Sequence, residues 1–265
     1  SLPWKPKVEH GMGHRNYLLE ENIKFFKKHK TGPPFEMADV EDSAYFDGKT
    51  TLEALNRLNQ LSNNQKPFFL AVGFVKPHLP FNAPKKYWDL YDHSKIQLPG
   101  NPNQPTNAPP KAKHAFGELR KFDGIPKNPL PVSDSMARKL IHGYYACVSY
   151  IDAQIGILLE GLDNLNLSEN TIVFILGDHG WSLGEHGLWA KHSPFDLATR
   201  TPLIVRTPEH LSETYKSGRA HGLVEFIDIF PTIMELVDLA ELDQLDGKSF
   251  VEQLKDPLSD GKEVV

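Results

Sequence analysis

The sequence has only one cysteine, Cys147, among its 265 residues. A single cysteine excludes an internal disulfide framework and the zinc sites built from paired cysteines. The formal net charge is -5, and dense runs of lysine and arginine are absent, so nucleic acid is not expected as a partner. No apolar run reaches the length of a membrane span, and no signal peptide is recognisable at the start of the sequence.

The remaining composition is typical of a soluble globular protein, with 40% hydrophobic and 24% charged residues. The length allows one large domain or two small ones, each with its own core. Many of the 21 prolines fall between residues 99 and 131. We therefore predict that residues 82–132 form a long irregular connection that shapes a cleft, with Tyr87, Trp88 and Tyr91 as packing anchors.

Helical spacing of apolar residues occurs in three segments, at residues 50–61, 136–162 and 228–237. Ser133 or Asp134 can cap the second helix, and Asp228 can cap the third. Pro231 falls in the first turn of the third helix, where proline is tolerated. Cys147 lies beside the apolar stripe of the second helix without an adjacent base, which indicates a core thiol rather than a nucleophile.

Buried strands are predicted for three short apolar segments, at residues 67–74, 171–176 and 201–206. Residues 16–26 fit either a short helix or a strand. The order of strand, long connection, helix, two strands and helix is typical of a layered α/β domain.

Polar side chains are concentrated directly after the predicted strand at 171–176. Asp178 and His179 arrive where the strand ends, and a glycine-rich loop then adds Glu185, His186, Lys191 and His192. Ligand sites in α/β proteins form outside the carboxyl ends of strands. An isolated Asp-His pair could equally be a turn in which Asp178 binds its own backbone, but the clustering favours a functional site.

His78 follows the predicted strand at 67–74 and lies between Pro77 and Pro80. The two prolines restrict the backbone and present the imidazole in a reproducible way. The residues alone leave two interpretations open, a functional histidine or a hydrogen-bonded structural one.

Six motifs occur in a fixed order along the sequence: Pro67–Gly73, Lys76–Phe81, Tyr145–Asp152, Asp178–Gly187, Trp189–Lys191 and Phe230–Thr232. Together they resemble the sulfatase family of the alkaline-phosphatase-like superfamily, and within it the iduronate-2-sulfatase branch. The similarity extends from Pro67 to Ala240. It implies a layered αβα sandwich with a mixed, mostly parallel sheet, present here in incomplete form.

The resemblance implies hydrolysis of a sulfate ester beside a divalent ion, usually calcium, and a formylglycine made from cysteine or serine. By position, Asp178 and His179 would be metal ligands. Lys191 and His78 would contact sulfate oxygens, and one of them would protonate the leaving alcohol. Calcium prefers oxygen ligands, so the nitrogen of His179 leaves zinc and manganese open as alternatives.

The resemblance also implies a sulfated sugar, such as a uronic acid within a polysaccharide, as the substrate. Trp181 could stack on the sugar ring and Glu185 could accept hydrogen bonds from its hydroxyl groups. An equally supported alternative is that Trp181 packs inward and Glu185 caps the next turn. The family further implies a secreted, periplasmic or lysosomal location.

The family's Cys/Ser-x-Pro-x-Arg nucleophile motif, its adjacent aspartates and its Lys/His pair have no counterpart in this sequence. Residues 1–265 are therefore expected to be a partial catalytic domain that is inactive alone, with 241–265 as the start of a truncated C-terminal region.

Two other functions remain open. A metal-dependent phosphatase or phosphonate hydrolase of the same superfamily would use a similar Asp-His pair. A non-catalytic carbohydrate-binding relic would keep an aromatic surface at Trp88, Trp181 and Trp189, although core packing is the favoured interpretation of Trp88.

Overall fold

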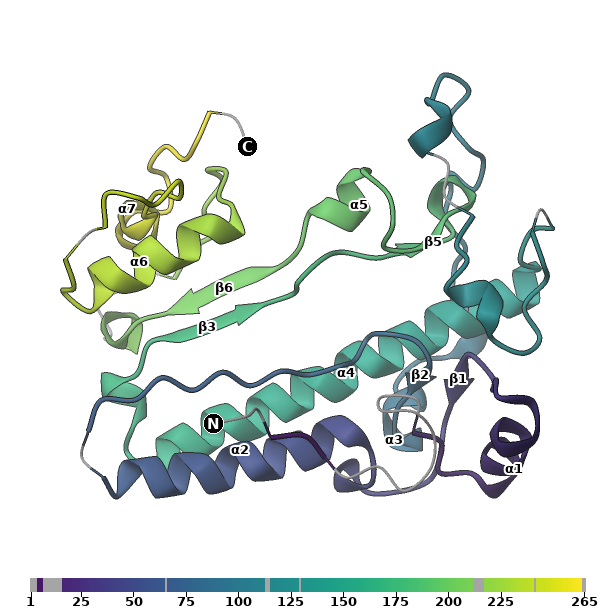
Figure 1. The fold of residues 1–265 in the computed structure, drawn as a ribbon, viewed down its shortest axis with the longest axis horizontal. Coiled ribbons are helices and arrows are strands. Elements are labelled where there is room, and N and C mark those ends of the chain that lie inside the picture. The colour runs from purple at the N-terminus through teal and green to yellow at the C-terminus, as the bar shows by residue number, and fades with distance from the viewer. Residues whose placement is uncertain are drawn as a thin grey trace. The chain divides into compact units, whose positions relative to one another are not determined.

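The computed structural model describes residues 4–6, 16–64, 66–112, 115–128, 130–211, 217–240 and 242–263. The chain divides into two compact units (Figure 1). Unit 1 contains Ser1–Ser168 and Leu176–Leu203, and unit 2 contains Glu169–Ile175 and Ile204–Val265. Within the described residues, no helix is both long enough and apolar enough to cross a membrane.

Unit 1 is built around one long helix, α4 (Asp134–Asn164). Its predicted cap is confirmed, because Ser133 Oγ accepts a hydrogen bond from the Met136 N–H at 3.4 Å. The predicted helix at 50–61 is α2 (Phe46–Ser62), which packs against α4. The shorter helices of this unit are α1 (Glu20–His29), α3 (Lys85–Trp88) and α5 (Asp196–Thr199).

The core of unit 1 lies between α4 and the segments before it. Tyr87 and Trp88 are buried there, and Tyr91 is partly buried against them. Cys147 is fully buried, and burial raises the pKa of its thiol to about 12. The thiol is therefore protonated and structural, as the sequence predicts.

Tyr150 on α4 joins that helix to the start of α2. Its hydroxyl donates to the Asp42 carbonyl at 2.9 Å and accepts from the Gly48 N–H at 2.7 Å. Gly48 is required at this close approach, since a Cβ at that position would lie 2.1 Å from the Asp42 carbonyl oxygen. The Tyr150 side chain is completely buried, and its hydroxyl is the acceptor for the Gly48 N–H, whereas the Asp42 carbonyl also accepts from the Tyr45 N–H at 3.3 Å.

The strands form three pairs in the described residues. In unit 1, β1 (Phe35–Glu36) runs parallel to β2 (Phe81–Asn82), and β4 (Ser182–Leu183) runs antiparallel to β5 (Trp189–Ala190). β3 (Val173–Leu176) pairs with β6 (Leu203–Arg206), which confirms two of the three predicted strands. The α/β class and the mixture of strand directions are confirmed, with small sheets in place of one large sheet.

The strand predicted at residues 67–74 is not formed. These residues have neither strand nor helix, and Phe69 is 81% exposed. A strand needs a neighbour for its N–H and C=O groups, and no described segment pairs with this one. The segment has the apolar composition of a buried strand, but the described residues contain no neighbouring strand for it to pair with.

Unit 2 contains β3, β6 and the helices α6 (Ile229–Leu236) and α7 (Val251–Lys255). α6 confirms the predicted helix, with Pro231 in its first turn. Asp228 occupies the cap position, but its carboxylate instead accepts from the N–H groups of Glu225 and Lys248. Of residues 241–265, positions 241, 264 and 265 lie outside the described residues.

Several 3₁₀ helices connect these elements, and η4 and η6 border the site described below. They span Asp42–Ala44 (η1), His93–Lys95 (η2), Pro110–Ala112 (η3), Leu119–Lys121 (η4), Ser168–Asn170 (η5), Glu185–Gly187 (η6), Pro208–Leu211 (η7) and Phe226–Asp228 (η8). Three of them fall within residues 82–132, whose described part also contains α3 and the second residue of β2.

Replacing Tyr150 with Phe is expected to lower the free energy of unfolding by about 1–3 kcal/mol, because the buried Gly48 N–H loses its acceptor and the Asp42 carbonyl loses one of its two donors. Urea denaturation followed by tryptophan fluorescence would measure it. Tyr145→Phe is the matched control on the same helix, since Tyr145 is 40% exposed, and a change within about 0.5 kcal/mol is expected. Equal losses of unfolding free energy in the two variants would show that the Tyr150 hydroxyl does not stabilise the contact between α4 and α2.

Candidate active site

The segment that carries His78 is held in place by a buried carboxylate. Asp47 of α2 accepts hydrogen bonds from the Val75 N–H at 2.8 Å and from the Lys76 N–H at 3.0 Å. The Asp47 side chain is buried, so α2 fixes where the turn begins. The turn then continues through Pro77 and Pro80, both of which follow cis peptide bonds.

Lys76 closes the same turn from inside. Its Nζ donates to the His78 carbonyl at 2.7 Å and to the Pro80 carbonyl at 2.6 Å. Burial lowers the pKa of the Lys76 ammonium and raises the pKa of the Asp47 carboxyl, because each charge loses hydration. The attraction between the two opposite charges offsets part of both changes. Lys76 therefore supports the backbone around His78 and is not directed at a ligand.

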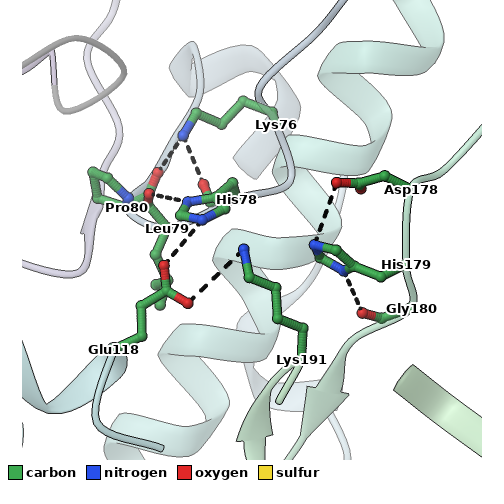
Figure 2. A network of polar contacts seen from close by, with 9 residues as sticks. All are labelled: Lys76, His78, Leu79, Pro80, Glu118, Asp178, His179, Gly180 and Lys191. Carbon is green, nitrogen blue, oxygen red and sulfur yellow. Dashed lines mark hydrogen bonds and ion pairs between the residues drawn. The ribbon is translucent and has the colours of Figure 1, made fainter. Parts of the chain in front are cut away.

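The His78 imidazole is fixed at both nitrogens (Figure 2). Its Nδ1 lies 2.7 Å from the Leu79 carbonyl oxygen, and its Nε2 lies 3.0 Å from Glu118 Oε1. A carbonyl only accepts, so Nδ1 carries a proton. Burial lowers the pKa of His78, the Leu79 carbonyl and Glu118 raise it, and Lys191 lowers it.

Lys191 follows β5 and points toward the same carboxylate. Its Nζ lies 4.0 Å from Glu118 Oε2 and 5.8 Å from the centre of the Trp181 ring. Only about a fifth of the Lys191 side chain is exposed. Lys191 directly follows the last residue of β5, so the pairing of β4 with β5, in which Leu183 lies opposite Trp189, fixes its backbone position.

Asp178 and His179 follow β3, in the loop where the sequence predicts them. His179 Nδ1 lies 2.8 Å from the Gly180 carbonyl oxygen, and Nε2 lies 3.6 Å from Asp178 Oδ2. Gly180 allows this loop to approach α5, because a Cβ there would lie 1.9 Å from the Leu197 carbonyl oxygen. The Asp178 side chain is 88% exposed, so its carboxylate is available to a ligand.

The Asp178–His179 pair offers two of the several ligands that a divalent cation needs, an arrangement called a cation half-site below. With a proton on Nδ1, the lone pair of His179 Nε2 faces a carboxylate oxygen beyond hydrogen-bond range. A hydrogen bond from the other ring nitrogen to a carbonyl is typical of metal-bound histidines. No third His, Cys, Asp or Glu joins them among the described residues. The pair therefore fits two ligands of a divalent cation and does not form a complete site.

Trp181 and Glu185 make internal contacts. Trp181 is only 9% exposed, and its ring contacts those of His78 at 5.9 Å and His179 at 6.1 Å between centroids. Glu185 Oε2 accepts from the Leu183 N–H at 2.6 Å. These contacts match the inward-packing and turn-capping alternatives, and the substrate-binding roles of both residues stay predictions.

Figure 2 shows which side chains lie together. His78, Lys191 and Glu118 form one group, with the Asp178–His179 pair nearby in the same unit. Sequence reasoning identified four of these five residues and missed Glu118. Glu118 lies in the proline-rich connection just before η4, where no local pattern distinguishes it from a solvent-exposed acid. Asp47 was also missed, because its partners lie 28 and 29 residues away.

Comparisons with known proteins identify the family to which this chain is similar. The family model described as Sulfatase matches residues 8–239. The iduronate 2-sulfatase of Mus musculus is 37% identical over 234 residues, which cover 78% of this chain and 42% of that protein. A sulfatase of Formosa agariphila is 34% identical over 201 residues, which cover 76% of this chain and 38% of that protein.

A solved structure with a similar fold is the phosphonate monoester hydrolase SpPMH from Silicibacter pomeroyi. Its TM-score is 0.68 at 23% identity, and the match covers 85% of this chain and 44% of that one. The chain thus spans about two-fifths of the length of the curated relatives it matches.

Replacing Asp47 with Asn is expected to destabilise unit 1 by about 1–3 kcal/mol, because the amide nitrogen would face a backbone N–H and one buried hydrogen bond would be lost. Urea denaturation would measure the loss. Asp39→Asn is the matched control, since Asp39 is exposed, and it should leave the midpoint unchanged. An unchanged midpoint in the Asp47 variant would contradict the proposed anchoring of the turn.

Proposed function

The chain belongs to the sulfatase family, and from this premise we propose that the protein it forms part of is a sulfuric ester hydrolase. The observation that carries the proposal is the convergence of His78 and Lys191 beside a half-site for a cation (Figure 2). The activity requires groups that the described residues do not supply, so we propose that residues 1–265 alone are inactive.

Lys191 is proposed to bind the sulfate group. Only about a fifth of its side chain is exposed, and its Nζ lies 4.0 Å from Glu118 Oε2. A cation held in a partly desolvated position stabilises negative charge more strongly than one in water. We therefore assign Lys191 to a sulfate oxygen and to the charge that develops as the ester bond breaks.

His78 is proposed to supply the proton for the leaving alcohol. Nδ1 is committed to the Leu79 carbonyl, so Nε2 is the nitrogen that can exchange a proton. Proton transfer from a positioned imidazole contributes typically 10²- to 10⁴-fold to a rate. Nε2 lies 3.0 Å from Glu118 Oε1, so this carboxylate borders the nitrogen that is proposed to deliver the proton.

Asp178 and His179 are proposed to hold one divalent cation, calcium by family resemblance. When bound, such an ion neutralises charge on the sulfate oxygens. The remaining ligands and the residue that becomes formylglycine are proposed to come from sequence outside these 265 residues. The nitrogen of His179 is less usual for calcium, so metal analysis of the longer protein would identify the ion.

The proposed substrate is a sulfated sugar within a polysaccharide, by similarity to proteins that include an iduronate 2-sulfatase. Residues 82–132 are proposed to border the cleft, since they contribute Glu118 to the site. We keep a secreted, periplasmic or lysosomal location as part of the same proposal.

A phosphonate or phosphate ester hydrolase is the second candidate. It is favoured by one observation, the fold shared with the phosphonate monoester hydrolase of Silicibacter pomeroyi. A carbohydrate-binding relic has less support, because Trp88 and Trp189 are each only 5% exposed and do not offer an aromatic surface.

The longer protein that carries this chain is expected to hydrolyse an aryl sulfate much faster than an aryl phosphonate. Lys191→Ala should lower kcat/KM on the sulfate by about 10²- to 10³-fold, as loss of one charge-stabilising group does. Lys95→Ala, at a lysine whose side chain is 83% exposed, is the control and should have no effect. A preference for the phosphonate would reject the proposal, and turnover by residues 1–265 alone would reject their inactivity.

Trp181→Ala in the longer protein tests the predicted substrate contact. If the indole binds the sugar, turnover of a sulfated sugar should fall at least about tenfold more than turnover of an aryl sulfate, since only the former loses a ring contact. Steady-state kinetics on both substrates would measure the ratio. Equal losses would show that Trp181 only supports the rings of His78 and His179.

A further inference from the structure

Glu118 is the residue of this site that neither the sequence motifs nor the family resemblance identifies. Its side chain is about one-fifth exposed, and its two oxygens face different partners. Oε1 lies 3.0 Å from His78 Nε2, and Oε2 lies 4.0 Å from Lys191 Nζ (Figure 2). Oε2 is buried and accepts no hydrogen bond from the described residues.

The His78–Glu118 contact requires a shared proton. Nδ1 of His78 already donates to the Leu79 carbonyl. If Nε2 were unprotonated, its lone pair would face a carboxylate oxygen at 3.0 Å, which is repulsive. A proton therefore lies between Nε2 and Oε1, on one atom or the other. The pair therefore keeps a proton next to the nitrogen assigned to the leaving alcohol.

The charges around His78 make the carboxylate necessary. Burial lowers the pKa of His78, and the charges of Lys191 and Lys76 lower it further, whereas among the acidic side chains of the described residues Glu118 raises it. Without Glu118, the imidazole would face two cations and no anion. It would lose its proton at a lower pH.

The longer contact with Lys191 has a different consequence. A separation of 4.0 Å exceeds hydrogen-bond length, so the carboxylate attracts the ammonium without a direct bond. Lys191 keeps its three donors for an anionic ligand. One carboxylate thus binds the imidazole firmly and the ammonium loosely.

We propose, on the basis of the proposed function, that Glu118 is a positioning residue that orients His78 for proton delivery and keeps Lys191 directed at the sulfate. It acts through these two side chains and does not contact the reacting atoms. The residue comes from the proline-rich connection, so this connection contributes to the order of the site as well as to its border.

The test compares Glu118→Gln with wild type in the longer protein, using kcat/KM on an aryl sulfate across pH. His78 must be protonated to deliver its proton, so activity falls as the pH rises through its pKa. Removing the carboxylate lowers that pKa, and the alkaline limb should move down by about one pH unit. The rate at the optimum should fall about tenfold or more.

Two further variants separate positioning from a structural effect. Asp123→Asn removes the same charge from an exposed residue of the same connection and should leave the alkaline limb in place. Glu118→Asp keeps the charge and should restore the limb, though not the full rate. A fall in rate for Glu118→Gln that is equal at every pH, or no change in rate, would overturn the proposal.

A second readout does not depend on turnover. The His78 imidazole can be titrated by NMR in wild type and in Glu118→Gln, and its midpoint should be lower in the variant. If the wild-type protein cleaves no sulfate ester, the proposed function fails, while a lower midpoint still supports the coupling of Glu118 to His78. An unchanged midpoint overturns the role of Glu118 whatever the activity.

Discussion

The site depends on the carboxylate of Asp47 and the two backbone N–H groups that it accepts from. This contact joins the start of α2 to the turn that carries His78. Lys76 then crosses the interior of the turn and binds two of its carbonyls. Burying the Asp47 and Lys76 charges costs hydration free energy. The hydrogen bonds that these two side chains make to the backbone around His78 offset part of that cost. The imidazole is therefore oriented by the protein's core before any ligand arrives.

Local patterns predicted the elements that depend on local sequence. The stripe of α4, the cap at Ser133 and the strands β3 and β6 were all read correctly, because periodicity and capping involve neighbouring residues. The family resemblance placed the candidate site, whose individual roles stay predictions. Glu118 and Asp47 could not be predicted, since each acts on residues distant in sequence and neither carries a local signal.

Two errors have a common physical origin. The segment at 67–74 was expected to be a strand, and Asp228 was named as a residue that can cap α6; it occupies the cap position without a hydrogen bond from its side chain. Both predictions used correct propensities, but each outcome depends on a partner elsewhere. The first segment lacks a neighbour in the described residues, and Asp228 instead binds the N–H groups of Glu225 and Lys248. Intrinsic propensity shows which conformations a segment can adopt, and its tertiary contacts determine which one it adopts.

The exposed segment 67–74 also affects how this chain behaves among copies of itself. Phe68 to Phe74 has no charge, no proline and high β-propensity, which is the composition of segments that add to sheets of other molecules. Lys66 is exposed and precedes this segment, as charged residues often flank such segments in natural proteins, whereas Lys76 on the other side is buried inside its turn. Repulsion between the Lys66 side chains of neighbouring copies opposes stacking of identical strands and is screened by salt. Low ionic strength should therefore keep the separated chain in solution, whereas high salt should favour its self-association.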